Sequence, residues 1–309
     1  MTDKIIALAM VGRSTVSFEV VTQWIKALRT RWWPGPVFLM PEIYAAGAWI
    51  GVVPLRNLVT YHALKDPSWD YLLWIDADHR IHHHLFDRVQ AHARAGEQLV
   101  CGCYYSRSYP FEVQAFSEAV EGGVKFVPPT WLVPAFNMMM RGGYPSVQLA
   151  AAGVDFRPRD GVTGAPLIKV AGAGTGCMLV SREVLEMMAE VRGPGEIWRV
   201  DRVPWAEQIR LLEQGEMISG VLTEDIMFCL DVKAELSVTC WLDLDPRMET
   251  GHMGEMPVDR RQYLAAHQVT IPTGVDPAKV LPKGYEFVDG GGRRFGPVVT
   301  DAQGKPHRS

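Results

Sequence analysis

The sequence has few cysteines, no long apolar run and almost no excess of either charge. Its five cysteines include no C-x-x-C pair and are too scattered for a disulfide framework, so we expect reduced thiols in a cytoplasmic protein. No apolar stretch approaches the roughly 18 residues that a membrane-spanning helix needs. The short apolar run between Lys4 and Gly12 leads to no clear cleavage site, which favours a buried first strand over a signal peptide.

The charge balance excludes a strongly basic nucleic-acid binder, because 31 Lys and Arg residues stand against 35 Asp and Glu, a formal charge of −4. Apolar residues make up 48% and charged residues 21%, as in soluble globular proteins. This composition excludes a disordered chain, a collagen and a coiled-coil rod. A length of 309 residues suits one large domain or two modest ones.

Strand-like and helix-like segments alternate along most of the chain. Short apolar runs predict strands over 5–11, 37–40, 71–75, 98–104, 167–170 and 237–242. Apolar residues at helical spacing predict helices over 18–28, from Pro54 onward, after His84, over 181–190 and over 223–236. Strands alternating with helices imply an α/β fold with a mostly parallel central sheet that helices cover on both faces.

Two regions depart from this alternation. Residues 126–166 are rich in Pro, Gly, Met and Trp and show little periodicity, which predicts an irregular insertion. The pattern weakens again from Pro257, and the tail after Asp289 contains a Gly-Gly-Gly-Arg-Arg run that is typical of a flexible end. We therefore expect one domain over 1–256 and a C-terminal extension over 257–309.

The strongest local signal is Tyr71-Leu-Leu-Trp-Ile-Asp76-Ala-Asp78, in which two carboxylates one residue apart follow a buried strand. Ligands of open α/β sheets bind outside the carboxyl ends of strands, and strand alternation places Asp76 and Asp78 on one side of the chain. Two hard oxygen ligands so placed suit Mg²⁺ or Mn²⁺ on a diphosphate. A solvated loop explains the same two acids, because Asp is common after strands.

Two further signals each have a structural and a functional interpretation. Thr223-Glu224-Asp225 opens a helix, where Thr223 can cap the first turn and the acids favour the helix dipole. In the functional interpretation, Asp225 or Glu224 is a general base that takes a proton from an attacking hydroxyl. Gly251-His252 follows a strand, and neutral imidazole is a common metal ligand, although a lone His is more often a loop residue.

Two other segments carry weaker signals. Gly172-Ala-Gly174-Thr-Gly176 has G-x-G-x-G spacing and lies past mid-chain, so it does not fit the G-x-G-x-x-G dinucleotide fingerprint. Its glycines allow close backbone approach and predict an open floor for a substrate. The run His82-His83-His84 is more simply explained as the exposed start of a helix than as a metal site.

Together and in this order, these segments resemble the GT-A glycosyltransferases, particularly the family-2-like branch that uses nucleotide sugars. The resemblance runs from about Lys4 to Gly254, which covers most of the chain. It includes the first strand with Val11-Gly12-Arg13, the helix with Arg56-Asn57, the D-x-D strand end, Cys103-Tyr-Tyr-Ser-Arg107, 171–182, Thr223-Glu224-Asp225 and Gly251-His252. It implies a GT-A catalytic domain over 1–256, with a Rossmann-like, mostly parallel central sheet flanked by helices and an acceptor-side insertion over 126–166.

The resemblance implies a metal site. Asp76 and Asp78 look like the D-x-D acids that hold Mn²⁺ or Mg²⁺ on the diphosphate of a nucleotide-sugar donor, and His252 looks like the third ligand. The ion neutralises charge that grows on the leaving diphosphate. Because a metal-ligand His is frequent in retaining members as well, His252 leaves the stereochemical outcome open.

The resemblance also implies a base and a donor pocket. Asp225 matches the acid that serves as catalytic base in inverting members, with Glu224 beside it. The glycine-rich segment matches the floor beneath the donor sugar and the acceptor. The residues that the resemblance places around the donor are Arg13, Arg56, Asp76, Gly174 and Gly176.

These features predict a soluble, metal-dependent glycosyltransferase of the hexosyltransferase type that moves a sugar from a UDP-sugar to a hydroxyl. The acceptor stays open between a saccharide, a protein, a small molecule and a modified DNA base of the kind that bacteriophage enzymes glycosylate in the host cytoplasm.

Two alternatives share the fold. A nucleotidyltransferase would have a loop rich in Gly and basic residues directly after the first strand. The segment Val11-Gly12-Arg13 at this place has too few of these residues. A non-catalytic nucleotide-sugar binder predicts loss of an acid among Asp76, Asp78 and Asp225, and all three are present.

Overall fold

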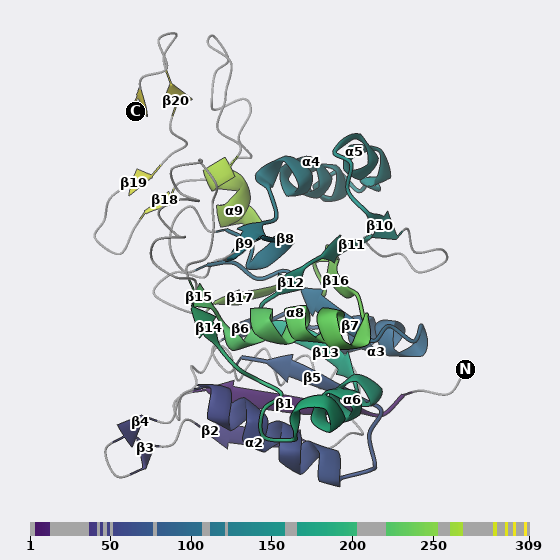
Figure 1. Ribbon diagram of the computed structural model, residues 1–309. Helices are drawn as coiled ribbons and strands as arrows, with labels where there is room; N and C mark the ends of the chain where they lie inside the picture. Colours follow the sequence, from purple (N-terminus) through teal and green to yellow (C-terminus); the bar gives the residue numbers. More distant parts are fainter. Residues whose placement is uncertain are drawn as a thin grey trace.

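A computed structural model shows an α/β architecture built on one large sheet (Figure 1). The structure describes residues 4–12, 37–41, 44–45, 48–49, 52–76, 79–106, 112–120, 123–157, 166–202, 221–252, 260–267, 287–288, 294–295, 299–300 and 306–307. The helix that the sequence predicts over 18–28 lies outside the described residues. Within the described part, no helix combines the length and the apolar character that crossing a bilayer demands.

Eight strands form the central sheet. Their spatial order is β10 (Phe156–Arg157), β11 (Leu167–Val170), β16 (Cys240–Asp243), β7 (Leu99–Gly102), β13 (Cys177–Ser181), β5 (Tyr71–Ile75), β1 (Ile6–Gly12) and β2 (Val37–Pro41). β13 is antiparallel to β5 and β7, and β11 is antiparallel to β16 and β10, while the remaining pairs are parallel. Because the other strands all run in one direction, the predicted mainly parallel sheet is confirmed.

Helices cover both faces of this sheet, as the alternation predicts. α2 (Val52–Lys65), α6 (Arg182–Arg192) and α8 (Glu224–Leu236) pack on one face, and α3 (Leu85–Arg94) packs on the other. Along β5, Leu72 and Trp74 enter the core with the first three helices, whereas Leu73 and Ile75 enter the core with α3. The unbroken apolar run of β5 therefore reflects a strand that is buried on both faces.

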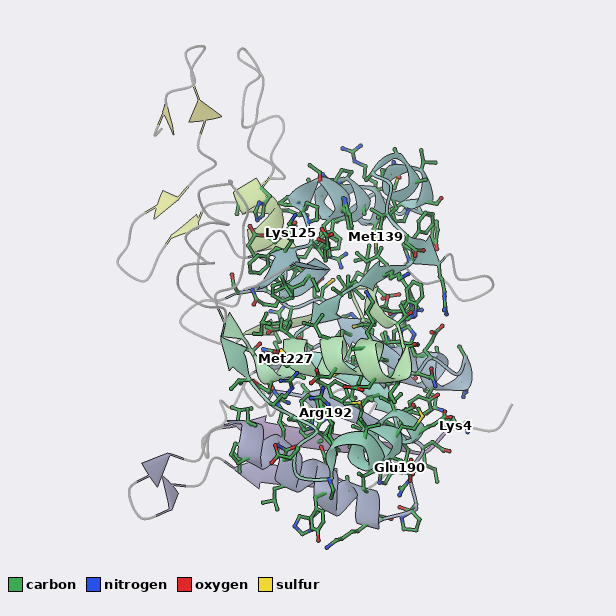
Figure 2. The ribbon with its side chains drawn as sticks, in the orientation of Figure 1. Lys4, Lys125, Met139, Glu190, Arg192 and Met227 are labelled. Carbon is green, nitrogen blue, oxygen red and sulfur yellow. The ribbon has the colours of Figure 1, made fainter. Side chains whose placement is uncertain are left out.

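Ion pairs fasten two of the helices to each other. Arg192, at the end of α6, places Nη1 2.6 Å from a carboxylate oxygen of Asp231 and Nη2 3.3 Å from Glu235, and both acids lie on α8. Arg199 donates two hydrogen bonds of 2.9 Å to Asp231. Figure 2 shows Arg192 at the junction of the two helices. These contacts fix α8 relative to α6 and so to the strands beneath them.

The region that the sequence predicts as an irregular insertion contains two helices, α4 (Pro129–Met140) and α5 (Ser146–Ala151), which corrects the prediction for these two segments of 126–166. Pro129 stands in the first turn of α4, where its missing N–H has no intrahelical partner to lose. Gly142, with φ +76°, follows the end of α4. The helix escaped prediction because Pro134 lies inside it and its largely apolar sequence has no polar face.

Short strands outside the central sheet form small sheets. β8 (Ala115–Val120), β9 (Gly123–Phe126) and β12 (Gly172–Ala173) form one of three strands. The two-stranded pairs are β6 (His79–Ile81) with β17 (Thr250–His252), β14 (Asp201–Arg202) with β15 (Val221–Leu222), β3 (Tyr44–Ala45) with β4 (Ala48–Trp49), β18 (Phe287–Val288) with β19 (Arg294–Phe295), and β20 (Val299–Thr300) with β21 (Pro306–His307).

The first part of the predicted C-terminal extension belongs to the main core. α9 (Arg260–His267) contributes Tyr263 and Leu264 to the larger core cluster and contacts α4. The boundary that the sequence predicts after residue 256 therefore falls just before a helix that packs with the rest of the fold. Of the predicted flexible tail after Asp289, three short strands alone lie within the described residues.

Candidate functional site

Several predicted residues meet at one edge of the central sheet. β5 ends there, and Asp76 follows it. β13 is antiparallel to β5 and begins where β5 ends, so Gly176 comes next to Asp76. β7 runs in the direction of β5 and leads into Tyr104 at the same edge. Since ligands of open α/β sheets bind outside the carboxyl ends of strands, this edge is the candidate site.

Arg56 of α2 connects two of the predicted motifs. Its Nη2 donates to Oδ1 of Asp76 at 3.1 Å, and its Nε donates to Oε1 of Glu224 at 3.0 Å. Nη2 also donates to the hydroxyl of Thr175, within the glycine-rich segment. Although Asp76 and Glu224 are 148 positions apart in the sequence, one guanidinium holds both. The acid after β5, the start of α8 and the glycine-rich segment therefore form one arrangement.

The guanidinium of Arg56 is a buried structural cation. Its side chain is 4% exposed and lies over the rings of Trp74 and Trp198, 5.2 and 5.5 Å from their centroids. Burial lowers its pKa, but the charges of Asp76, Glu224 and Asp225 outweigh burial and leave the pKa raised. Among the described residues, its hydrogen bonds go to Asp76, Glu224 and Thr175, and its predicted contact with the donor stays a prediction.

Asp225 is held by three donors at the start of α8. Its Oδ1 accepts from the backbone N–H of Ile226 at 2.9 Å, and its Oδ2 accepts from the backbone N–H of Thr175 at 3.2 Å. The hydroxyl of Thr223 donates to Oδ1 as well. Thr223 occupies the N-cap position with extended backbone, yet its side chain makes no cap hydrogen bond. The predicted cap residue orients the carboxylate of Asp225 instead.

The surroundings of Asp225 suit a proton acceptor. Burial and, to a smaller extent, the neighbouring charge of Glu224 raise its pKa to about 7. The hydrogen bond from Thr223 and the charge of Arg56 oppose this shift without cancelling it. A general base works best when its pKa lies near the operating pH. At the start of α8, Asp225 is therefore the carboxylate that is best placed to accept a proton near neutral pH.

The glycine-rich segment packs against two side chains. A Cβ on Gly174 would lie 2.1 Å from the phenolic oxygen of Tyr104, and a Cβ on Gly176 would lie 2.4 Å from Cε1 of His79. The Nδ1 of His79 is also 3.0 Å from the carbonyl oxygen of Gly176. The chain's own Tyr104 and His79 therefore occupy the space beside these glycines, where the sequence predicts an open floor for a substrate.

Tyr104 is a candidate site residue that sequence reasoning missed. Burial raises the pKa of its hydroxyl well above the ordinary value, and the charges of Asp225, Asp76 and Glu224 raise it further. The phenol therefore stays protonated beside three carboxylates. The available signal was its position at the end of the strand predicted over 98–104, in Cys103-Tyr-Tyr-Ser-Arg107.

The late Gly251-His252 segment lies beside the strand that follows the D-x-D motif. β17 pairs with β6 in an antiparallel register that sets His252 opposite His79 and Gly251 opposite Arg80. The backbone of His252 therefore lies opposite the residue that comes three positions after Asp76. Asp78 and Arg13 lie outside the described residues, and of His252 the structure describes the backbone alone.

The rings of the three consecutive histidines lie close together at the start of α3. The ring centroids of His82 and His83 are 4.3 Å apart, and those of His83 and His84 are 4.2 Å apart. Burial and the two neighbouring rings together lower the pKa of His82 to about 4. Nδ1 of His84 lies 3.1 Å from the carboxylate of Asp87 one turn later. These contacts fit the predicted helix start.

Comparisons with known proteins give remote structural likenesses. No protein-family model matches the sequence, and no curated protein matches it. Similar solved structures include protein A197 from STIV, with 14% identity and a TM-score of 0.44, where the match covers 83% of this chain and 91% of that one. The synthase of 4-diphosphocytidyl-2C-methyl-D-erythritol from Anaerococcus prevotii has 13% identity and a TM-score of 0.29, over 76% and 99% of the two chains.

A third similar structure is mannose-1-phosphate geranyltransferase from Thermus thermophilus. Its identity is 13% and its TM-score is 0.31, and the match covers 77% of this chain and 73% of that one. Since all three TM-scores are below 0.5, these likenesses assign neither a family nor an activity to the chain. The function must therefore be inferred from the residues at the sheet edge.

Proposed function

We propose that the chain is a metal-dependent glycosyltransferase of the GT-A fold, which moves a hexose from a UDP-sugar to a hydroxyl acceptor. The observation that carries the proposal is the bridge that Arg56 makes between Asp76 and Glu224. This bridge holds Asp76, the proposed donor-side acid, close to Glu224 at the start of α8, at the carboxyl end of β5. Beside it, Asp225 has a pKa of about 7.

The donor side of the proposed site is suited to a divalent ion. Asp76 keeps 27% of its side chain exposed even though Arg56 holds one of its oxygens, so the carboxylate is accessible to a ligand. The register of β17 with β6 brings the His252 backbone to the segment that follows Asp76. Carboxylate ligands fit Mn²⁺ or Mg²⁺. Asp76, Asp78 and His252 would hold the ion, which when bound neutralises the charge of the donor diphosphate.

The acceptor side depends on Asp225. Its carboxylate takes the proton of the attacking hydroxyl, while the N–H groups of Thr175 and Ile226 and the hydroxyl of Thr223 fix its orientation. Tyr104 keeps its proton beside this carboxylate. Saccharides, proteins, small molecules and modified DNA bases all offer such a hydroxyl, so we propose the reaction class without one acceptor.

Thermal unfolding with Mn²⁺ and UDP tests the donor site, and a sugar-transfer assay tests the catalytic base. With Mn²⁺ and UDP, the wild type should unfold at a higher temperature, because a ligand at about 100 times its Kd stabilises by about 2.7 kcal/mol. Asp76→Asn should lose this metal-dependent shift. Asp225→Asn should keep the shift and lose sugar transfer. Asp155→Asn, an exposed acid paired with Lys169, is the matched control and should behave as the wild type.

Other outcomes of this experiment identify the alternatives. UDP binding without release of UDP from any nucleotide sugar would indicate a non-catalytic binder. Pyrophosphate release from a nucleoside triphosphate and a sugar phosphate would indicate a nucleotidyltransferase. The absence of any metal-dependent shift with UDP would contradict the proposed donor site.

A further inference from the structure

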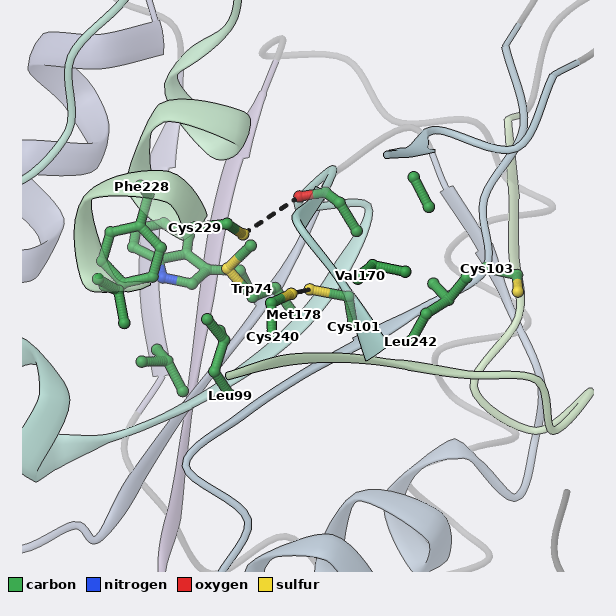
Figure 3. Close-up of a cluster of buried hydrophobic side chains, with 14 of the residues drawn as sticks. Trp74, Leu99, Cys101, Cys103, Val170, Met178, Phe228, Cys229, Cys240 and Leu242 are labelled. Atoms are coloured by element: carbon green, nitrogen blue, oxygen red, sulfur yellow. Dashed lines mark hydrogen bonds between the residues drawn. The ribbon is translucent and has the colours of Figure 1, made fainter. Parts of the chain in front are cut away.

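Three buried cysteines from distant parts of the sequence converge behind the sheet edge. Cys101 lies on β7, Cys229 on α8 and Cys240 on β16, and each is at most 1% exposed. Their sulfur atoms all lie within 4.8 Å of one another. The sulfurs of Cys101 and Cys240 are 3.8 Å apart. Figure 3 shows this three-cysteine cluster between the sheet and α8.

The topology brings these thiols together. β7 and β16 are parallel neighbours whose register pairs Cys101 with Leu242, two residues after Cys240 on the same face. α8 crosses above them, and the sulfur of Cys229 donates to the carbonyl oxygen of Ala173 at 3.7 Å. Met178 lies directly opposite Cys101 across the β7–β13 pair and belongs to the same core. The side chain of Met178, which is a thioether, therefore lies on the same face of the sheet as the thiol of Cys101.

We propose that Cys101, Cys229 and Cys240 bind one thiophilic d¹⁰ metal ion, with Cu⁺ favoured over Zn²⁺. The sulfur spacing fits, because two thiolates about 2.3 Å from a shared ion lie roughly 3.8–4.0 Å apart. Thiolate and thioether ligands select soft ions such as Cu⁺. Structural Zn²⁺ almost always has four ligands, whereas the cluster among the described residues supplies three thiols.

The surroundings of the cluster are apolar. The side chains around it in Figure 3 include Trp74, Leu99, Val170, Phe228 and Leu242. Cysteine binds a metal ion as thiolate, so each thiol that binds the ion releases its proton to solvent. The ion would tie β7, β16 and α8 together, apart from the proposed transferase site.

Metal titration of the full-length, reduced protein under anaerobic conditions tests this site. Cu⁺ added against a chromophoric Cu⁺ chelator should bind at one ion per chain and produce a thiolate-to-metal charge-transfer band. X-ray absorption should show a shell of sulfur ligands alone. A parallel titration with Zn²⁺ should show weaker binding. Failure of the wild type to retain Cu⁺, or a nitrogen or oxygen shell, would overturn the proposal, and Zn²⁺ binding without Cu⁺ binding would overturn the choice of ion.

A matched pair of variants locates the ion. Cys229→Ala removes a proposed ligand, and Cys103→Ala removes an equally buried thiol that lies outside the cluster. Cys229→Ala should weaken Cu⁺ binding by more than the ~10–100-fold that loss of a supporting contact causes, while Cys103→Ala should bind as the wild type. Equal binding by both variants would overturn the assignment. If circular dichroism shows that Cys229→Ala is unfolded, the X-ray absorption spectrum of the wild type with Cu⁺ tests the proposal, because it shows whether sulfur atoms alone surround the ion.

Discussion

Asp225 combines burial with hydrogen bonds to both carboxylate oxygens. Burial disfavours its charged form more than Thr223, Arg56 and Ile226 favour it, so its pKa rises to about 7. Below that pH the carboxyl is protonated and cannot accept a proton from a hydroxyl. We therefore expect kcat/KM for sugar transfer to increase with pH, with a midpoint near 7, and to level off above it. A pH–rate profile from about pH 5 to 9 measures this.

A second acid on the same helix gives the control for this prediction. Asp231 is also buried, but it pairs with Arg199 and Arg192 away from the candidate site. Asp231→Asn should lower stability and leave the midpoint of the profile unchanged. A midpoint near the ~4 of an ordinary carboxyl group would mean that the catalytic base is a solvated acid, which contradicts the role of Asp225.

Arg56 pairs with Asp76 and Glu224 and also lowers the pKa of Asp225, so it should affect both stability and the pH dependence of activity. Arg56→Met leaves Asp76 and Glu224 without their cation, so we expect the free energy of unfolding to fall by up to ~3–5 kcal/mol, the range for breaking a buried pair. The loss should be at the lower end, since Asp76 keeps 27% of its side chain exposed. Because the charge of Arg56 lowers the pKa of Asp225, the activity midpoint should move to higher pH.

Urea unfolding and the pH–rate profile together check the prediction for Arg56. Arg199→Met is the control, since Arg199 pairs with Asp231 and its side chain is 42% exposed. It should cost little stability and leave the midpoint in place. An unchanged midpoint in Arg56→Met would show that Arg56 does not act on Asp225.

At the scale of elements, the turn from β12 into β13 depends on glycine. A Cβ at Gly174 or Gly176 would meet Tyr104 or His79 at 2.1 or 2.4 Å. We expect Gly174→Ala to destabilise the protein by about 1–3 kcal/mol, the usual cost of overpacking, and to displace Tyr104 from the acids. Gly195→Ala is the matched control, because no atom lies within 4 Å of the added Cβ.

Thermal unfolding and a double variant measure this effect. Gly174→Ala combined with Tyr104→Ala should recover part of the stability that Gly174→Ala loses, because the clashing ring is gone. Losses that simply add in the double variant would show that Tyr104 is not the neighbour that requires glycine at this position.

The sequence predicts the elements that have clear periodicity or an unbroken apolar run. β5 and β1 were found because both consist of apolar residues, as a strand buried on two faces must. α8 was found from its acidic first turn and the apolar residues after it. α4 was missed because Pro134 interrupts it, and β13 was missed because its five residues sit between a glycine segment and a helix. The antiparallel direction of β13 depends on its pairing with β5 and β7, which are far away in the sequence, so local sequence patterns do not predict it.

At the scale of the whole molecule, one buried ion cluster joins α3 to the end of β16. Asp243 is fully buried and accepts hydrogen bonds of 2.6 and 3.0 Å from Arg88, and His92 Nε2 lies 2.6 Å away. Burial alone would raise its pKa, but Arg88 and His92 hold it well below the ordinary value. The stability that this carboxylate contributes is therefore present above about pH 4 and is lost as the pH falls below it.

Asp243→Asn should lower the free energy of unfolding at pH 7 by up to ~3–5 kcal/mol, because buried Arg88 loses the carboxylate that accepts its hydrogen bonds and keeps the more distant Asp245, at 3.7 Å, as a charged partner. Between about pH 4 and 2, stability should fall less steeply in the variant than in the wild type. Urea unfolding at several pH values measures both effects. Asp155→Asn, at an exposed pair, should leave both unchanged. Equal acid sensitivity of the Asp243 variant and the wild type would contradict the assigned role.

The comparison of two D-x-D motifs shows how far the site could be predicted. Asp243-Leu-Asp245 also stands at the carboxyl end of a strand, like the motif at Asp76. Arg88 and Arg247 neutralise its acids, whereas Asp76 stays partly exposed next to α8. Spacing alone does not separate these two motifs, since burial and cationic partners come from residues far away in the sequence. For the same reason, neither the burial of Arg56 nor the close approach of Tyr104 to Gly174 was predictable.

Release of nucleoside diphosphate tests the central claim most directly. The protein is incubated with Mn²⁺ and a panel of nucleotide sugars, and free diphosphate is measured with and without a hydroxyl acceptor. We expect the wild type to release UDP from a UDP-sugar in a Mn²⁺-dependent manner, and Asp76→Asn to release none above background. Release from no donor by the wild type, or equal release by Asp76→Asn, would contradict the proposal that the carboxyl end of β5 holds a sugar donor.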